Sequence, residues 1–321
     1  MEKNFPKISI CVLTHNSEKT IKECIESIEK IDYPNFELII VDDNSKDKTI
    51  EIAKIKKNSI NIKLIEIKEK TKIGKLRNIA VQNSSGEIIA FTDSDCTVQK
   101  NWLKELIKGF SDEKTAGAGG PNLTLKENSD FQKCIGNFYE FFSVIGAQYV
   151  KNSENIIEVK HNPSCNSAYR KKILEEINGF NENIASNEDP ELDFRIRKKG
   201  YTLLFNPKAI VFHHRKKNLA EFFRQAEWFG KGRMQAIKQN TEMLELFRLI
   251  PIAYLVLLIG SILLLKFGFF VSLIAIFAGF SIIVSALIAF KYELKDFFAY
   301  LLLFIAWFFG YGIGEIKGVF S

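Results

Sequence analysis

Two apolar runs of this 321-residue chain lead directly into pairs of acidic residues. Residues 88–92 precede Asp93 and Asp95, and residues 38–41 precede Asp42 and Asp43. Apolar strands that end in acid suit an open parallel sheet, whose ligands bind just beyond the strand ends. Carboxylate oxygens there can hold a divalent cation, which commonly bridges to phosphate. The pattern favours a metal-assisted enzyme that uses a nucleotide diphosphate, although Asp is also frequent in surface turns after strands.

The first part of the chain alternates strand and helix patterns, which predicts a doubly wound α/β sheet. Ser17 is a candidate N-cap for the first helix. The region from residue 116 to residue 212 is less regular and ends in a strand at residues 201–205. The expected strands are residues 8–13, 38–41, 62–67 and 88–92, and the expected helices are residues 21–31, 50–57, 74–83 and 102–110.

The composition argues against several other classes of protein. The net charge of +6 is modest and spread along the chain, which does not suggest a nucleic-acid partner. The 5 cysteines form no CxxC pair, so neither a disulfide framework nor a zinc site follows from them. The polar residues 1–7 lead into a strand without a secretory signal, so we expect the start of the chain to stay in the cytoplasm.

The C-terminal part of the chain changes abruptly to three apolar segments, at residues 249–265, 267–290 and 297–313. Each is close to the roughly 17 to 25 residues that cross a bilayer. The basic residues before them should remain cytoplasmic. Three crossings are expected, and an arrangement with two stays open.

A connector rich in basic and aromatic residues precedes these segments. Such a helix suits the membrane interface, but it could equally pack against a catalytic domain. We therefore expect a catalytic domain over residues 1–215, an amphipathic connector over 216–248 and a transmembrane region over 249–321.

Four motifs in order give the chain a resemblance to a known family. They are residues 9–16, residues 41–45, the Asp93-Ser94-Asp95 element and the Glu188-Asp189 pair. Together they resemble a family 2 glycosyltransferase of the GT-A fold over about residues 6–215. The resemblance implies a GT-A-type, Rossmann-like α/β domain with a doubly wound, mostly parallel sheet, followed by C-terminal transmembrane helices.

The resemblance also implies how the donor nucleotide is bound. Thr14 and Asn16 would flank the base, and Asp43, beside Asp42, would accept hydrogen bonds from base or ribose. The alternative for Thr14 and Asn16 is turn and capping chemistry.

A basic element lies further along the chain. Lys75 and Arg77 open a helix and would lie near the diphosphate, since a guanidinium and a helix N-terminus both favour anions. The competing interpretation is a solvated basic face.

The resemblance assigns the metal site to the DxD element. Asp95 would bind Mg²⁺ or Mn²⁺, whereas Asp93, with Ser94, would contact the nucleotide-sugar through ribose or a metal-bound water. His213, or its neighbour His214, follows the last strand, where some GT-A enzymes place a metal-binding histidine. A histidine at such a position is more often structural than a ligand.

Asp189 matches the catalytic base of the family. It would take the proton of an acceptor hydroxyl as that oxygen attacks the anomeric carbon, which inverts the configuration. The alternative is an acidic helix start, favourable to the helix dipole. Glu188 and Asn166 would lie near the donor sugar or the acceptor.

The sequence thus predicts a membrane-anchored, inverting glycosyltransferase. It would move a sugar from a UDP- or GDP-sugar to a polyprenyl phosphate or polyprenyl-linked saccharide at the cell membrane, in surface glycan or protein glycosylation. Two alternatives stay open: a non-catalytic nucleotide-binding membrane scaffold, and a nucleotidyltransferase of related fold.

Overall fold

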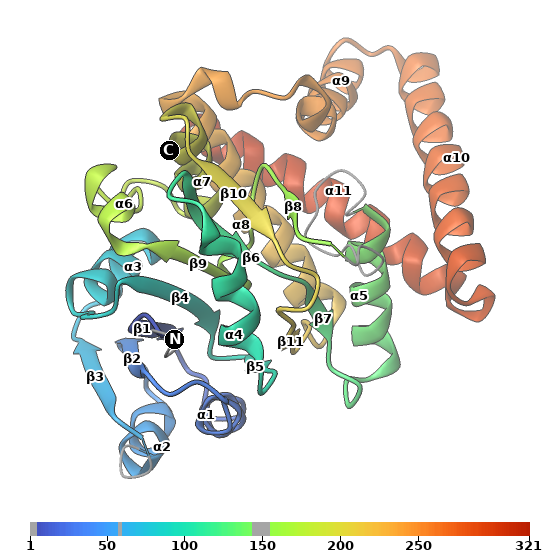
Figure 1. Ribbon diagram of the computed structural model, residues 1–321. Coiled ribbons are helices and arrows are strands. Elements are labelled where there is room, and N and C mark those ends of the chain that lie inside the picture. The colour runs from blue at the N-terminus through green and yellow to red at the C-terminus, as the bar shows by residue number, and fades with distance from the viewer. Residues whose placement is uncertain (1–4, 57–59, 143–154) are drawn as a thin grey trace. The chain divides into compact units, whose positions relative to one another are not determined.

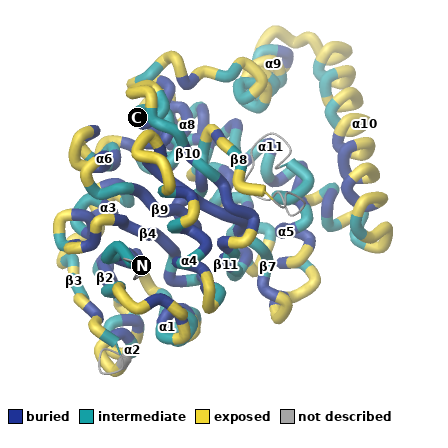
Figure 2. The backbone as a smooth tube through the Cα atoms, in the orientation of Figure 1, coloured by how far each residue is buried: buried dark blue, intermediate teal, exposed yellow. Residues whose placement is uncertain are grey.

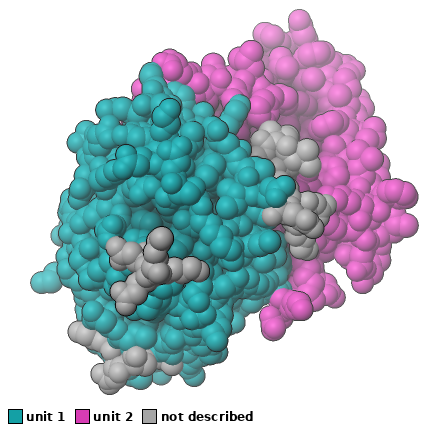
Figure 3. Space-filling view, in the orientation of Figure 1, with its two compact units in different colours: residues 1–125, 143–183, 188–214 teal, residues 126–142, 184–187, 215–321 magenta. Residues whose placement is uncertain are grey.

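The computed structural model describes residues 5–56, 60–142 and 155–321. The chain divides into two compact units, shown in different colours in Figure 3. Unit 1 consists of residues 1–125, 143–183 and 188–214. Unit 2 consists of residues 126–142, 184–187 and 215–321. Unit 2 therefore includes two short segments that lie, by number, inside the expected catalytic domain.

A sheet of 8 strands forms the centre of unit 1 (Figure 1). Its order is β3-β2-β1-β4-β9-β6-β10-β8, with β8 and β9 antiparallel to their neighbours and the other pairs parallel. The predicted mostly parallel sheet is therefore confirmed. The strands are β1 (Ile8–Thr14), β2 (Phe36–Asp43), β3 (Ile62–Ile67), β4 (Ile88–Asp93), β6 (Thr115–Gly119), β8 (Ile157–Glu158), β9 (Ser167–Arg170) and β10 (Thr202–Phe205).

Helices cover both faces of this sheet. The alternation of β1 sends Ile10 and Val12 to one core and Cys11 and Leu13 to the other, so every residue of the strand is buried. The first core is closed by α1 (Ile21–Glu29), α2 (Thr49–Lys56) and α4 (Trp102–Ile107). The second is closed by α3 (Ile73–Gln82), α6 (Lys171–Glu176) and α7 (Glu188–Lys198).

A second, 3-stranded sheet was not predicted. It consists of β5 (Cys96–Val98), β11 (Val211–His213) and β7 (Asn122–Thr124), in that order. Strands of 3 residues are too short for an alternating pattern to be recognised. The prediction of Ser17 as a helix cap was wrong: Thr20 occupies that position without a side-chain cap bond, and the Ser17 carbonyl accepts from the Thr20 and Ile21 amides.

Unit 2 is helical. Three of its helical segments, Leu246–Leu263, Phe267–Lys291 and Leu294–Val319, are long and apolar enough to cross a membrane. Exposed apolar residues run along α9 and α10 (Figure 2), among them Val256, Phe269 and Ile276. The helices are α5 (Asp130–Phe142), α8 (Leu219–Gln239), α9 (Ile250–Leu263), α10 (Phe267–Lys291) and α11 (Phe297–Val319).

The connector helix α8 packs closely against α11 within unit 2. A Cβ atom at Gly314 would lie 2.0 Å from the Glu227 carbonyl oxygen, and one at Gly230 would lie 2.1 Å from the Tyr311 carbonyl oxygen. Glycine is therefore required where the two backbones approach, as is common in packed apolar helices. Phe222 and Ala226 of α8 are fully buried. The connector thus packs on an apolar helix, an arrangement that neither interpretation of the sequence included.

Candidate active site

The carboxyl ends of β1, β2 and β4 meet at one edge of the large sheet. The strand register pairs Thr14 with Asp42, and Leu13 with Asp93. The acidic pairs that follow two distant apolar runs are therefore neighbours in space. This edge is where open α/β sheets bind their ligands.

The loops beyond β1, β2 and β3 are tied together by side chains. Asn16 has a φ of 50°. Its side-chain Oδ1 accepts from the Lys46 backbone amide at 2.8 Å, and its backbone amide donates to Ser45 Oγ at 2.8 Å. Asp43 Oδ1 accepts from the Thr71 amide at 2.9 Å. The hydroxyl of Thr14 is buried and has no partner among the described residues. The predicted contacts of these groups with the nucleoside stay predictions.

Asp42 and Ser94 are engaged within the protein. Asp42 is fully buried, and its two oxygens accept from the amide and the hydroxyl of Ser45, at 2.9 and 2.5 Å. Ser94 Oγ lies 2.8 Å from Ser17 Oγ. Both side chains shape the loops at this edge, and their predicted contacts with the nucleotide-sugar stay predictions.

Arg77 connects the DxD element to the Glu188-Asp189 pair. Its side chain is 1% exposed. Its Nε donates to Glu188 Oε1 at 3.0 Å, and one Nη lies 3.9 Å from Asp93 Oδ1. The same Nη donates to Ser164 Oγ at 2.6 Å. Arg77 therefore holds two acidic elements together, whereas Lys75 of the same helix is exposed.

Glu188 is an unusually placed carboxyl group. Its side chain is 3% exposed. Burial, reinforced by the neighbouring Asp189 charge, raises the pKa of Glu188 to about 7, and Arg77 opposes that shift. Strongly shifted carboxyls often cluster at functional sites, so this shift is consistent with the prediction that Glu188 lies near the donor sugar or the acceptor.

Asp189 lies in the first turn of α7, next to Glu188. Its Oδ2 accepts from the Ser164 amide at 3.0 Å and lies 3.9 Å from His161 Nε2. The side chain is 18% exposed, so the carboxylate is fixed yet accessible. A general base needs both properties.

Asn166, in contrast, is committed to the interior. It is fully buried; its Oδ1 accepts from Trp102 Nε1 at 2.8 Å, and its amide nitrogen donates to the carbonyls of Pro121 and Ala209, at 2.9 and 2.7 Å. The side chain joins three segments of unit 1. The structure thus gives Asn166 an architectural role, and its predicted contact with sugar or acceptor stays a prediction.

Four potential metal ligands gather beyond β4. Asp93, Asp95, Cys96 and His213 each offer one ligand atom within 4.8 Å of the others. His213 Nε2 lies 3.1 Å from Asp95 Oδ1, because β11 pairs His213 with Cys96. Carboxylate oxygens with an imidazole suit Mn²⁺, so the residues present fit the predicted cation.

One member of that cluster, Cys96, and the adjacent His214 are less suitable as ligands. Burial raises the pKa of the Cys96 thiol well above its usual range, which disfavours the thiolate form that binds metals. His214 Nε2 lies 3.0 Å from Glu23 Oε2. Of the two histidines, His213 is therefore the one beside the DxD carboxylates.

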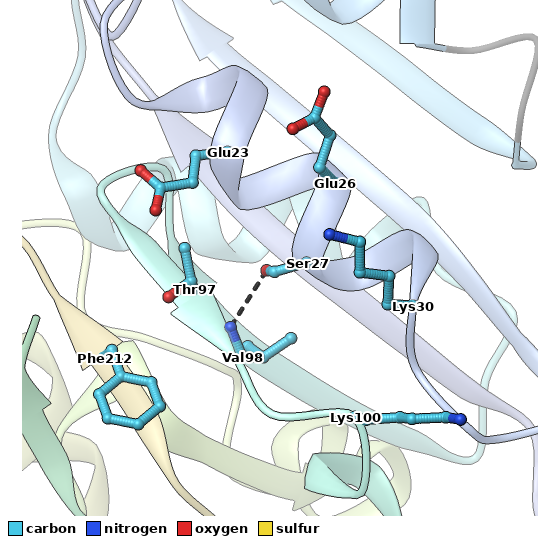
Figure 4. A pocket seen from close by; sticks show the side chains of 8 residues that line it. All are labelled: Glu23, Glu26, Ser27, Lys30, Thr97, Val98, Lys100 and Phe212. Atoms are coloured by element: carbon cyan, nitrogen blue, oxygen red, sulfur yellow. Dashed lines mark hydrogen bonds between the residues drawn. The ribbon is translucent and has the colours of Figure 1, made fainter.

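A surface groove of about 700 Å³ lies in unit 1 (Figure 4). It is lined by α1, with Glu23, Glu26 and Lys30, and by Thr97 and Phe212 of the small sheet. None of the residues that line this groove is one of the predicted site residues.

Comparison with known proteins identifies the family. Residues 9–178 match the profile described as "Glycosyl transferase family 2", which is more than half of the chain. This chain belongs to glycosyl transferase family 2. The predicted enzyme class is thereby confirmed at the level of the family.

Two relatives of this family 2 member are each 25% identical to it. "Probable glycosyltransferase YdaM" of Bacillus subtilis is 25% identical over 243 residues, which cover 73% of this chain and 57% of YdaM. A Methanococcus voltae protein is 25% identical over 269 residues, covering 79% of this chain and 81% of that protein. Its name is "Dolichyl N-acetyl-alpha-D-glucosaminyl phosphate 3-beta-D-2,3-diacetamido-2,3-dideoxy-beta-D-glucuronosyltransferase".

A solved structure of similar fold is the mannosyltransferase PcManGT from Pyrobaculum calidifontis, in complex with GDP-Man and Mn²⁺. It superposes with a TM-score of 0.66 at 17% identity, over 99% of this chain and 88% of that chain. The GT-A fold expected for the family 2 enzyme is therefore confirmed.

Three residues that contact the candidate site were not identified by the sequence analysis: His161, Ser164 and Asp193. His161 lies in a loop, and Ser164 begins the short 3-10 helix Ser164–Asn166, and neither belongs to a recognised motif. Asp193 follows Asp189 by four residues on a helix, so its position on the same face could have been deduced from helical spacing.

Replacing Arg77 should destabilise the fold. Arg77→Met keeps the volume but leaves the buried Glu188 without its cation, and breaking a buried ion pair in this way costs about 3 to 5 kcal/mol. We expect a loss of about 3 kcal/mol in the free energy of unfolding, measured by denaturant titration in detergent. The exposed Lys75→Met, in the same helix, should change it by at most about 0.5 kcal/mol. Equal stabilities of the two variants would contradict the role of Arg77 as a structural link.

Proposed function

We propose that this chain is an inverting glycosyltransferase that moves a sugar from a UDP- or GDP-sugar to a lipid-linked acceptor at the cytoplasmic face of the cell membrane. The main support for this proposal is the position of Arg77. Its side chain contacts both Asp93, at the acidic edge, and Glu188. It also donates to Ser164, whose backbone amide donates to Asp189. The acidic edge predicted to bind the diphosphate-bearing donor and the candidate base thus belong to one cluster of ion pairs and hydrogen bonds.

The reaction follows from the chemistry of these side chains. Asp43 and the groups around it bind the nucleoside. Asp93, Asp95 and His213 would hold a divalent cation, Mg²⁺ or Mn²⁺, which when bound offsets the charge of the leaving nucleoside diphosphate. Asp189 accepts the proton of the acceptor hydroxyl as its oxygen attacks the anomeric carbon. A single base and one displacement invert the configuration there.

The nature of the acceptor is supported by unit 2 and by one relative. Three helical segments are apolar enough to enter a bilayer, and α9 and α10 leave large apolar side chains exposed. The Methanococcus voltae relative is named for a dolichyl-phosphate-linked substrate. A polyprenyl phosphate or polyprenyl-linked saccharide, in surface glycan or protein glycosylation, is the acceptor that fits both.

The test is a donor screen with the full chain in lipid nanodiscs. UDP- and GDP-sugars are supplied with Mn²⁺, with and without a polyprenyl-phosphate acceptor, and released nucleoside diphosphate is measured. We expect release from one donor class that rises with the acceptor and is strongly reduced in Asp189→Asn.

Other products would overturn the proposal. Nucleotide binding without turnover across all donors and acceptors would indicate a scaffold. Release of inorganic diphosphate, with nucleotide joined to an acceptor, would indicate a nucleotidyltransferase.

A further inference from the structure

Two carboxylates of α7 face one imidazole. Asp189 and Asp193 are four residues apart and so lie on one face of the helix. His161, from the loop that follows β8, places its Nδ1 2.8 Å from Asp193 Oδ2 and its Nε2 3.9 Å from Asp189 Oδ2. The ring therefore lies between the candidate base and a second carboxylate that the reaction does not use.

Asp193 anchors this imidazole. It is fully buried and accepts from the Asn162 amide at 2.9 Å and the Tyr169 hydroxyl at 2.9 Å, and its Oδ2 lies 2.8 Å from His161 Nδ1. Burial raises the pKa of Asp193, and the hydrogen bond from His161 is the largest opposing influence. Because the Asn162 amide and the Tyr169 hydroxyl both donate to this carboxyl, we assign it as the accepting carboxylate and Nδ1 of His161 as the donor in this pair. The orientation of the ring is thereby fixed, with Nε2 toward Asp189.

Two groups then lie near the same oxygen of Asp189, Oδ2. The Ser164 amide donates to Oδ2 at 3.0 Å, and His161 Nε2 lies at ion-pair distance from that oxygen. With Oδ2 engaged, Oδ1 is left to take the proton of the acceptor. We infer that His161, anchored by Asp193, is a positioning residue that fixes the Asp189 carboxylate for this task. The inference rests on the proposed function of Asp189 as the base.

The alternative is a purely structural histidine. In that case only the Nδ1 donor matters, because it satisfies the buried Asp193 carboxylate. The positioning role instead requires a proton on Nε2, so that the ring, with Nδ1 donating to Asp193, is an imidazolium facing the Asp189 carboxylate. The two roles therefore depend on different atoms of one ring and can be separated by substitution.

Asparagine and glutamine supply the matched pair. His161→Asn can place an amide nitrogen near the Nδ1 position and keep the bond to Asp193, but nothing replaces Nε2. His161→Gln can extend an amide toward Asp189 but gives up the Nδ1 position. Each variant thus retains one of the two contacts.

The experiment measures transfer kinetics, nucleoside-diphosphate binding and thermal unfolding of the full chain in detergent. We expect His161→Asn to unfold at the wild-type temperature, to keep its KM for the donor, and to lose about 10- to 100-fold in kcat, as misplaced catalytic groups do. His161→Gln should unfold at a lower temperature but recover part of kcat at temperatures where it is folded.

Failure of the positioning role can be distinguished from failure of the proposed function. Wild-type kcat in His161→Asn, or a loss confined to the donor KM, would overturn the positioning role while the proposed function stands. A wild-type chain that transfers no sugar would overturn the proposed function, and the role of His161 with it.

Discussion

Asp189→Asn should reduce kcat for sugar transfer by about 10²- to 10⁴-fold, the contribution typical of a general base. Asparagine matches the volume of aspartate, and its carbonyl oxygen can still accept from the Ser164 amide. The substitution therefore removes the proton-accepting group without removing the contact that fixes the loop. Steady-state release of nucleoside diphosphate measures the effect, and calorimetry should show unchanged binding of nucleoside diphosphate.

A second acidic residue provides the control. Asp32 is exposed and pairs with Lys104 at 2.6 Å, so Asp32→Asn makes the same chemical change in another part of unit 1. We expect wild-type turnover from it. If Asp189→Asn keeps its turnover, the base must be reassigned. If it loses turnover and nucleotide binding together, Asp189 supports the fold of the site rather than the proton transfer.

The strands that carry the acidic edge were predictable because they are long and apolar. The expected strand at residues 62–67 coincides with β3, and the expected strand at 88–92 differs from β4 by one residue. Periodicity identifies such runs because burial on both faces demands apolar side chains. The strands of 3 residues offer no such signal, yet β11 is what brings His213 next to Asp95. From the sequence, the proximity of His213 to Asp95 could be suggested only by the resemblance to the family.

The polar network was harder to predict, for a physical reason. Arg77 and Glu188 are 111 residues apart in sequence and in contact in space. A guanidinium at a helix start fits a bound diphosphate and a buried carboxylate equally well, and the sequence does not contain the burial that decides between them. The same holds for Asn166, whose amide is fully used inside the protein. Residue types were thus predictable where their partners were not.

Loss of the cation should be nearly as damaging as loss of the base. Asp95→Asn weakens a ligand set of Asp93, Asp95 and His213 by removing one negative charge. We expect weaker Mn²⁺ binding and transfer lowered by about 10²- to 10³-fold, as when one group that stabilises developing charge is removed. Chelation of the wild-type chain should have the same effect, reversed by added Mn²⁺. Calorimetric titration of Mn²⁺ and the transfer assay measure the two quantities.

The contribution of the cation can be isolated by comparing the binding of a free nucleoside with the binding of the nucleoside diphosphate. Without the cation, two phosphates would face the carboxylates of Asp93 and Asp95, and like charges at such distances repel. Asp95→Asn should therefore weaken Mn²⁺-dependent binding of the diphosphate and leave binding of the free nucleoside unchanged, since Asp43 lies on another strand end. His213→Asn should act in the same direction as Asp95→Asn. Wild-type Mn²⁺ affinity in both variants would show that the cation, if one binds, is held by other groups.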